Sequence, residues 1–171
     1  MPYLYVLVAV LLRLLPHPWN VTPMGAMFLF SGATFQRKTS SLLIPLLALI
    51  ISDFVVIQVL YHGRHPWLDP FTWLGFVSIS LIGWALRRSL SPVRLLAASL
   101  AGSLLFFVIS NFGVWAHGDL YPHTWSGLAT CYTAAIPFFR NTVIGDLFYA
   151  ILLFGSYYWL PQHRRTRLTG A

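Results

Sequence analysis

The sequence predicts an all-α membrane protein, a polytopic helix bundle of six membrane segments that forms a single domain over residues 1–171. Composition is the first reason. Of the 171 residues, 57% are hydrophobic and only 9% are charged, whereas a soluble domain carries about 25% charged residues. The second reason is the alternation of apolar runs with short basic clusters. Such a chain has the lipid bilayer as its solvent.

The apolar runs differ in length. A spanning helix needs about 20 residues. The third, fifth and sixth runs meet this need, the fourth is slightly short, and the first two are clearly short. Pro16, Pro18 and Pro23 separate the first two runs, which therefore form either two short tilted helices or one re-entrant hairpin. In both cases the chain returns to the side on which it started. The six runs cover residues 3–15, 23–35, 42–61, 71–86, 95–115 and 142–160.

Basic clusters fall in alternate connections and so predict the topology. Cytoplasmic loops carry an excess of Lys and Arg, which places both termini and the connections 36–41 and 87–94 in the cytoplasm. Short clusters between apolar runs are typical of membrane topology rather than of a face that binds nucleic acid, so nucleic acid is not an expected partner. The clusters are Arg37-Lys38, Arg87-Arg88-Arg94 and Arg164-Arg165-Arg167.

The last outer connection, residues 116–141, is too apolar to be a solvated loop. Its residues 126–139 read SGLATCYTAAIPFF, and their backbone must be hydrogen-bonded wherever it enters the membrane region. We therefore expect a short separate helix, or a re-entrant segment, at the outer surface. The last membrane segment would then begin near Arg140, and the positive end of its helix would face the outer side.

Polar residues gather in the outer half of the predicted bundle. A charge at the bilayer centre costs about 2.5–3.5 kcal/mol on insertion scales, so each charge needs a partner or a function. The two acids Asp53 and Asp146 are expected to be matched by the two bases Arg13 and Arg140. Either these groups form a structural ion-pair network, or they line an outward-facing cavity that binds a small molecule.

Aromatic side chains occupy the segment that would cover this cavity. Trp115, Tyr121, Trp125 and Tyr132 are expected to face inward as a lid that stacks on a flat ligand, although Trp and Tyr also serve as interfacial anchors. The predicted substrate-binding residues are Arg13, Asp53, Asn111, Trp115, His117, Tyr121, His123, Trp125, Cys131, Tyr132, Arg140, Asn141 and Asp146.

Motifs for metal binding or catalysis are missing from the sequence. His117 and His123 lack the spacing of a zinc site, so no resident metal or cofactor is expected. The alternative is that Cys131 or a nearby His supplies an axial bond to the metal of a bound corrinoid or haem. The chain has neither a nucleophile elbow nor a phosphate-binding loop motif, so no catalytic residue is assigned.

Three stretches resemble an uncharacterised family of small bacterial membrane proteins that are described as transport proteins. This resemblance implies a multi-pass protein of the bacterial inner membrane. Six helices with both termini inside and an outward site are also similar, in architecture alone, to the substrate-binding S components of energy-coupling factor (ECF) vitamin transporters. The stretches are RLLPHPWNVTPMGAMFLFSGA (13–33), IPLLALIISD (44–53) and SNFGVWAHGDLYPHTWSGLATCYTAAIPFFRNTVIGDLFYAILLFG (110–155).

The chain departs from the S-component pattern on its first segment. S components often carry an Ala-x-x-x-Ala stripe on helix one, where the energising module docks. Here Ala9 is followed four residues later by Arg13, so we do not expect helix one to serve this purpose unaided. A stripe of small residues on segment five is the possible substitute.

Together these observations predict a substrate-binding membrane transport protein, S-component-like, that takes up a small vitamin-like or cofactor-like compound through an outward-facing polar cavity. The expected partners are the lipid bilayer, the small-molecule substrate and an energising transporter module or other membrane subunit. Two alternatives remain open. One is a non-catalytic accessory subunit that packs within a larger membrane complex through its apolar faces. The other is a membrane enzyme that uses Asp53, Asp146 or His117.

Overall fold

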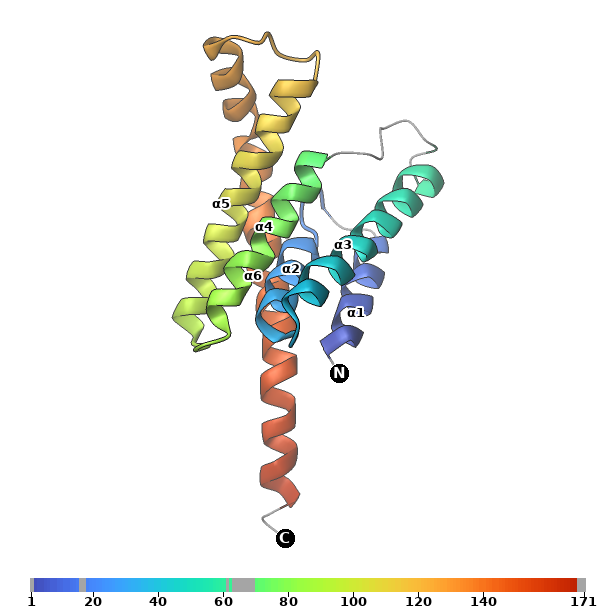
Figure 1. Ribbon diagram of the computed structural model, residues 1–171, viewed down its shortest axis with the longest axis vertical. Coiled ribbons are helices and arrows are strands. Elements are labelled where there is room, and N and C mark those ends of the chain that lie inside the picture. Colours follow the sequence, from blue (N-terminus) through green and yellow to red (C-terminus); the bar gives the residue numbers. More distant parts are fainter. Residues whose placement is uncertain (1, 16–17, 61, 63–69, 169–171) are drawn as a thin grey trace.

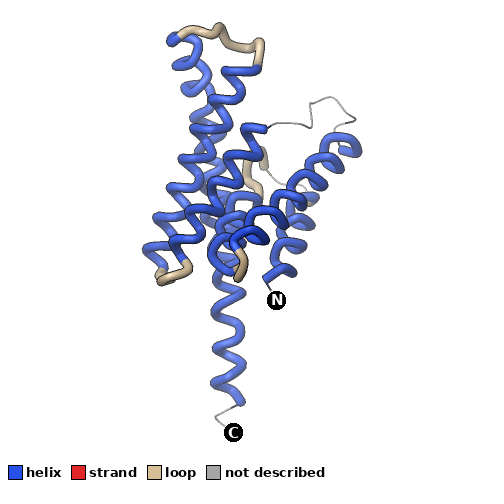
Figure 2. The backbone as a smooth tube through the Cα atoms, viewed as in Figure 1, coloured by secondary structure: helices blue, strands red, loops and turns tan. Residues whose placement is uncertain are grey.

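The computed structural model describes residues 2–15, 18–60, 62 and 70–168, and all regular structure in this part of the chain is helical (Figures 1 and 2). The all-α prediction is therefore confirmed. The elements in chain order are α1 (Pro2–Leu14), α2 (Met24–Thr34), α3 (Lys38–Val55) with its π-helical continuation η1 (Val56–Leu60), α4 (Pro70–Leu86), α5 (Pro92–His117) and α6 (Trp125–Leu168).

Helix lengths follow the expected order. Three stretches are long and apolar enough to cross a membrane, namely Lys38–Gln58, Pro92–His117 and Trp125–Tyr158. They correspond to the third, fifth and sixth apolar runs, as predicted. The helices α1, α2 and α4 are apolar but shorter. The first two runs form two short helices, and α2 returns toward the end of the molecule at which α1 starts (Figure 1).

Successive helices alternate in direction through the bundle. The start of α1, the end of α6 and the turns at 35–37 and 87–91 lie toward the lower end of the molecule in Figure 1. The linker 18–23 and the turn 118–124 lie toward the upper end (Figure 2). The basic residues of the turns at 35–37 and 87–91 therefore share one end of the molecule.

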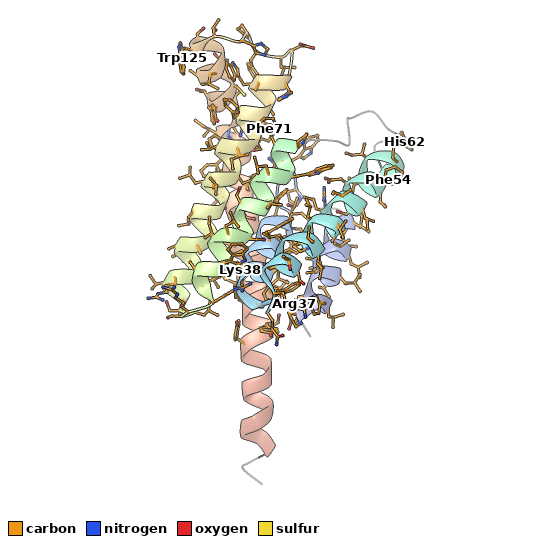
Figure 3. The ribbon with its side chains drawn as sticks, in the orientation of Figure 1. Arg37, Lys38, Phe54, His62, Phe71 and Trp125 are labelled. Carbon is orange, nitrogen blue, oxygen red and sulfur yellow. The ribbon has the colours of Figure 1, made fainter. Side chains whose placement is uncertain are left out.

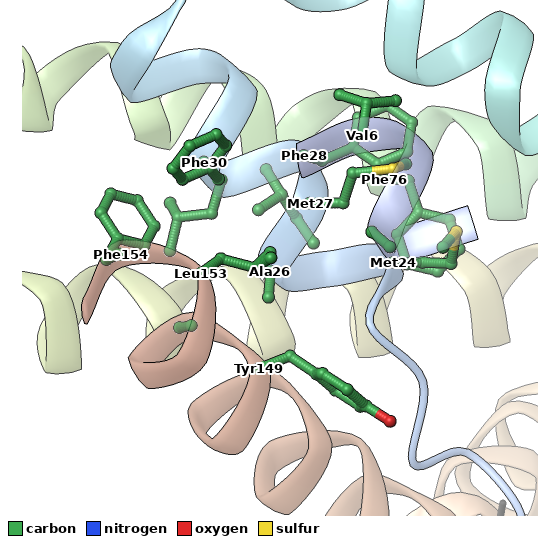
Figure 4. Close-up of a cluster of buried hydrophobic side chains, with 14 of the residues drawn as sticks. Val6, Met24, Ala26, Met27, Phe28, Phe30, Phe76, Tyr149, Leu153 and Phe154 are labelled. Atoms are coloured by element: carbon green, nitrogen blue, oxygen red, sulfur yellow. The ribbon is translucent and has the colours of Figure 1, made fainter. Parts of the chain in front are cut away.

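Helix α2 is the centre of the bundle, which explains its sequence. Every residue from Met24 to Gly32 is buried, as expected for a helix that is apolar all round. Its 11 residues extend over about 16 Å, roughly half of the hydrocarbon thickness. The α2 ring of Phe28 stacks on Phe76 of α4, and Phe30 meets Phe154 of α6 edge to face (Figure 4).

Close contact between α2 and α4 depends on glycine. A Cβ atom on Gly83 would lie 2.5 Å from the carbonyl oxygen of Leu29, so α4 approaches α2 too closely for any side chain there. The hydroxyl of Ser80 donates to the carbonyl of Phe28 at 3.0 Å across the same crossing. Small residues that let backbones approach, with a hydroxyl that joins them, are typical of membrane helix packing.

Charged side chains from other helices lie at both ends of α2. At its C-terminal end, Arg87 Nε donates to the carbonyl oxygen of Gly32 at 2.7 Å. At its N-terminal end, a Cβ atom on Gly25 would lie 2.7 Å from the carboxyl carbon of Asp146. A helix carries partial positive charge at its N-terminus and partial negative charge at its C-terminus. The acid and the base are thus placed to complement the dipole of α2.

The structure corrects the prediction for residues 116–141. A short separate helix was expected there, but α5 extends to His117, the connection is 118–124, and α6 is one helix of 44 residues that begins at Trp125. Both 126–139 and 142–160 are apolar, and neither Gly nor Pro stands between them at Arg140 and Asn141. A break there would leave backbone groups unpaired in apolar surroundings. The last segment therefore has no helix N-terminus near Arg140.

Candidate functional site

A cavity of about 350 Å³ lies between α4, α5, α6 and the linker that leads into α2. This volume falls in the range of small-molecule sites. Its polar lining residues are Arg13, Asn20, Thr22, Thr72, Ser110, Asn111, Thr142 and Asp146. Its apolar lining residues are Met24, Phe76, Phe106, Phe107, Ala135, Phe138 and Phe139.

The linker 18–23 forms one wall because its backbone turns sharply. Asn20 has a φ of 62°, in the left-handed region that Asn tolerates better than most residues, and the amide of Val21 donates to the carbonyl of Pro18 at 3.0 Å. The side-chain amide of Asn141 on α6 donates to the carbonyl of Trp19 at 3.0 Å. The predicted site residue Asn141 therefore anchors the linker and does not line the cavity.

Arg13 and Asp53 form the ion pair that their depth predicts. Arg13 Nη2 donates to Asp53 Oδ1, and Arg13 Nη1 donates to Ser52 Oγ at 2.8 Å. The indole of Trp73 on α4 donates to the second carboxylate oxygen of Asp53 at 3.1 Å. Both charged side chains are mostly buried. The prediction that Asp53 has a basic partner is confirmed, and this pair ties α1, α3 and α4 together.

Asp146 has a different environment. It lies on α6, is 5% exposed and lines the cavity. The hydroxyl of Ser103 on α5 donates to Asp146 Oδ2 at 2.6 Å, and the first turn of α2 lies beside the other face of the carboxylate. Asp146 is thus held by α5 and α2, with part of its surface open to the cavity.

The expectation that two bases, Arg13 and Arg140, match the two acids is met by Arg13 alone among the described residues. Within the described part of the chain, the ion pair is Arg13 with Asp53, and Arg140 is exposed. Arg140 and Asp146 are six positions apart on one continuous helix, which puts them on different faces, whereas pairs three or four apart are neighbours. The expectation failed because it placed a helix boundary at Arg140.

The predicted aromatic lid is not formed. Trp125 is 87% exposed at the far end of the α5–α6 hairpin (Figure 3). Trp115 donates from its indole to the carbonyl of Pro122 at 3.1 Å, and Tyr132 donates to the carbonyl of Val108 at 2.6 Å. These two rings tie the hairpin together, and Tyr121 is half-buried in its turn. Because α6 is one unbroken helix, the four predicted lid residues lie along the α5–α6 hairpin and do not fold back over the cavity.

His117, His123 and Cys131 are not part of the cavity wall. His117 is exposed at the end of α5 with its ring 5.0 Å from that of Phe71, and His123 is exposed beside Trp115. Cys131 is buried, and its thiol donates to the carbonyl of Asn111 at 3.5 Å. Among the described residues, no three His, Cys, Asp or Glu side chains come together to hold a metal. The corrinoid or haem alternative therefore receives no support from Cys131.

Three of the predicted residues, Arg13, Asn111 and Asp146, meet in one cavity. Asp53 lies behind Arg13, and the remaining residues lie outside the wall. Sequence reasoning missed the phenylalanines of the wall, although two Phe-Phe doublets, 106–107 and 138–139, stand on the two neighbouring helices. It also missed Ser103, which only its contact with Asp146 distinguishes from other serines.

Three helices that are long and apolar enough to span indicate a multi-pass helical membrane protein, and a cavity lined by polar and aromatic residues lies in its bundle. The chain belongs to a family of unknown function (DUF6580), whose model matches residues 1–168. No curated protein matches the chain. No solved structure matches it either.

Proposed function

We propose that this chain is a substrate-binding membrane transport protein of the bacterial inner membrane, which takes up a small vitamin-like or cofactor-like compound in the manner of an S component. The cavity of about 350 Å³ is the observation that carries the proposal. Polar groups within a membrane protein are expensive, and they mark substrate pathways by default. Here they converge from α1, the linker, α4, α5 and α6.

The orientation that we propose follows from charge. Arg37 precedes α3, and Arg87 and Arg88 follow α4, at the end of the bundle where α1 begins. The positive-inside rule makes this end cytoplasmic, so the linker 18–23 and the cavity face outward. The single native cysteine, Cys131, is buried, which favours labelling experiments. A cysteine at position 88 should react only from the cytoplasm and one at position 119 only from outside; reaction of both from one side contradicts this orientation.

An energising module, if one is engaged, would not dock on α1 as S components do. Ala9 is fully buried, and Arg13 is held by Asp53 and Ser52. On α5, Ala98 and Gly102 are also buried inside the bundle, whereas Ala97 and Ala101 are exposed. We therefore expect any such module to meet the exposed side of α5.

A cavity-filling variant tests the proposed function. Ala135 lines the cavity, and its neighbour Ala134 is exposed on the same helix. Native mass spectrometry of detergent-purified protein should detect a bound small molecule on the parent and on Ala134→Phe, and none on Ala135→Phe. Retention of the molecule by folded Ala135→Phe, or its absence from the parent expressed in rich medium, would contradict the proposal.

A further inference from the structure

Among the described residues, two charged side chains line the cavity, and one of them is neutralised by an ion pair. Arg13 faces the cavity but is paired with Asp53, which does not line it. Asp146 receives one hydrogen bond from an uncharged hydroxyl, that of Ser103. In the described part of the chain no cation pairs with Asp146. The charge presented to a ligand is therefore the carboxylate of Asp146.

The surroundings of Asp146 suit a carboxylate that binds a cationic ligand. The N-terminal end of α2 lies against the carboxylate at Gly25 and contributes roughly half a positive charge. Together with the Ser103 hydroxyl, it offsets part of the cost of burying the carboxylate and does not cancel its charge. A buried charge persists when it is paired or functional, and here the remaining surface of the carboxylate opens into a cavity of ligand size.

Phenylalanine rings line the same cavity as this carboxylate. Phe76 of α4, Phe106 and Phe107 of α5, and Phe138 and Phe139 of α6 all line the cavity. The face of an aromatic ring attracts a cation electrostatically, most strongly where water is excluded, and aromatic cages recognise substituted ammonium groups in this way. The same rings present apolar surface to the body of a small organic molecule.

We propose that the cavity selects a small organic cation, an ammonium or a protonated nitrogen heterocycle, whose charged nitrogen binds Asp146 and whose apolar body lies among the phenylalanine rings. The inference rests on the proposed function, because it names the class of substrate for the same cavity. Arg13 is left to its structural pair with Asp53, so a carboxylate or phosphate ligand would be disfavoured.

Three probes of one shape test this selection. Phenethylammonium, phenethyl alcohol and hydrocinnamate share a phenyl ring and a short chain but differ in charge. Binding to detergent-purified protein would be measured by saturation-transfer NMR titration. The cation should bind about tenfold tighter than the alcohol, and the anion should bind more weakly than either. Equal affinities, preference for the anion, or no binding of the cation would overturn the proposal.

Three variants test whether the preference for the cation depends on Asp146. Asp146→Asn should bring the affinity for the cation down to that for the alcohol. Because this change also touches the end of α2, a second pair leaves Asp146 in place. Thr142 lines the cavity one helical turn away on α6, so Thr142→Lys supplies an internal cation at i, i+4 spacing, and Thr142→Met fills similar space without charge. Thr142→Lys should abolish the preference for the cation, whereas Thr142→Met should weaken all probes and keep it.

The outcomes separate the two proposals. If Ala135→Phe blocks every probe but the preference for the cation survives Asp146→Asn and Thr142→Lys, the cation inference is wrong while the cavity remains the binding site. If probes bind folded Ala135→Phe as they bind the parent, the cavity is not the site, and the proposed function fails with the inference. Loss of all binding in Ala135→Phe and loss of the preference alone in Thr142→Lys support both.

Discussion

The surroundings of Asp53 and of Asp146 form an informative pair. Each acid lies on an apolar helix, and each is buried. Asp53 is enclosed by a guanidinium and an indole, which satisfy both carboxylate oxygens. Asp146 has one hydroxyl, a helix end and an open cavity. An aspartate that is paired with a cation, such as Asp53, thus holds helices together. An aspartate without such a cation among the described residues, such as Asp146, is available to a ligand.

The largest effect should come from removing the paired acid. Asp53→Ala removes the carboxylate that pairs with the mostly buried guanidinium of Arg13, and loss of one partner of a buried pair costs about 3–5 kcal/mol. The free energy of unfolding can be measured by SDS titration in mixed micelles. Asp146→Asn is the comparison, and it should lose less than half as much because no buried cation is abandoned. Equal losses for the two variants would remove the distinction between the two acids.

The contact between Asp146 and α2 gives the next effect. Gly25→Ala would put a Cβ atom 2.7 Å from the carboxyl carbon of Asp146, and overpacking of this kind costs about 1–3 kcal/mol. A loss near the upper end is expected because the displaced group is a carboxylate. The control is Gly155→Ala, where a Cβ meets nothing within 4 Å. Gly155→Ala should be neutral or slightly stabilising in α6; equal destabilisation by both would show that the contact is unimportant.

Two serines on α5 sharpen the comparison further. Ser103 donates to Asp146, whereas Ser99, one turn earlier, is buried with its hydroxyl unbonded among the described residues. Ser103→Ala should cost about 1.5 kcal/mol, the lower end of the range for hydrogen bonds to charged groups, because the cavity gives the carboxylate some access to water. Ser99→Ala should be neutral or stabilising in the same unfolding titration. The reverse order of the two would contradict the assigned hydrogen bonds.

The smallest effect should come from removing the hydrogen bond that the Trp73 indole donates to Asp53. Trp73→Phe removes the indole N–H that donates to the carboxylate at 3.1 Å but keeps an aromatic ring in place. We expect a loss of about 1 kcal/mol, typical of one hydrogen bond, because Arg13 still neutralises the charge. A loss as large as that of Asp53→Ala would mean that the indole, rather than the guanidinium, holds the acid.

The features of this protein that could be predicted from the sequence are those that depend on one helix at a time. Runs of apolar residues predicted which three helices are long enough to span, and the depth of Asp53 predicted a basic partner. Both depend on the bilayer acting on each segment separately. The prolines between the first two apolar runs likewise predicted an interruption, in the form of two short helices or a re-entrant hairpin, and α1 and α2 are separate short helices.

The remaining parts depend on continuity and on contacts between helices. Arg140 was expected to help match the two acids because a helix was expected to begin there, but α6 is one unbroken helix that places Arg140 and Asp146 on different faces. Phe107 and Phe139 became neighbours, with ring centroids 4.8 Å apart, only through the pairing of α5 with α6. The spacing of apolar residues within one helix does not show which helix packs against it. For this reason the sequence placed the lid wrongly and did not reveal the aromatic wall.

The burial of α2 has a consequence for the order in which the protein is made. This helix is second in the chain and packs against α1 and α3, but α4 and α6 also cover it, and the charged groups at its two ends, Arg87 and Asp146, are added late in synthesis. At about 16 Å it is also too short to remain stably across a bilayer alone. We therefore expect α2 to be fully enclosed only after α6 has been made, so that its packing is completed later than its synthesis.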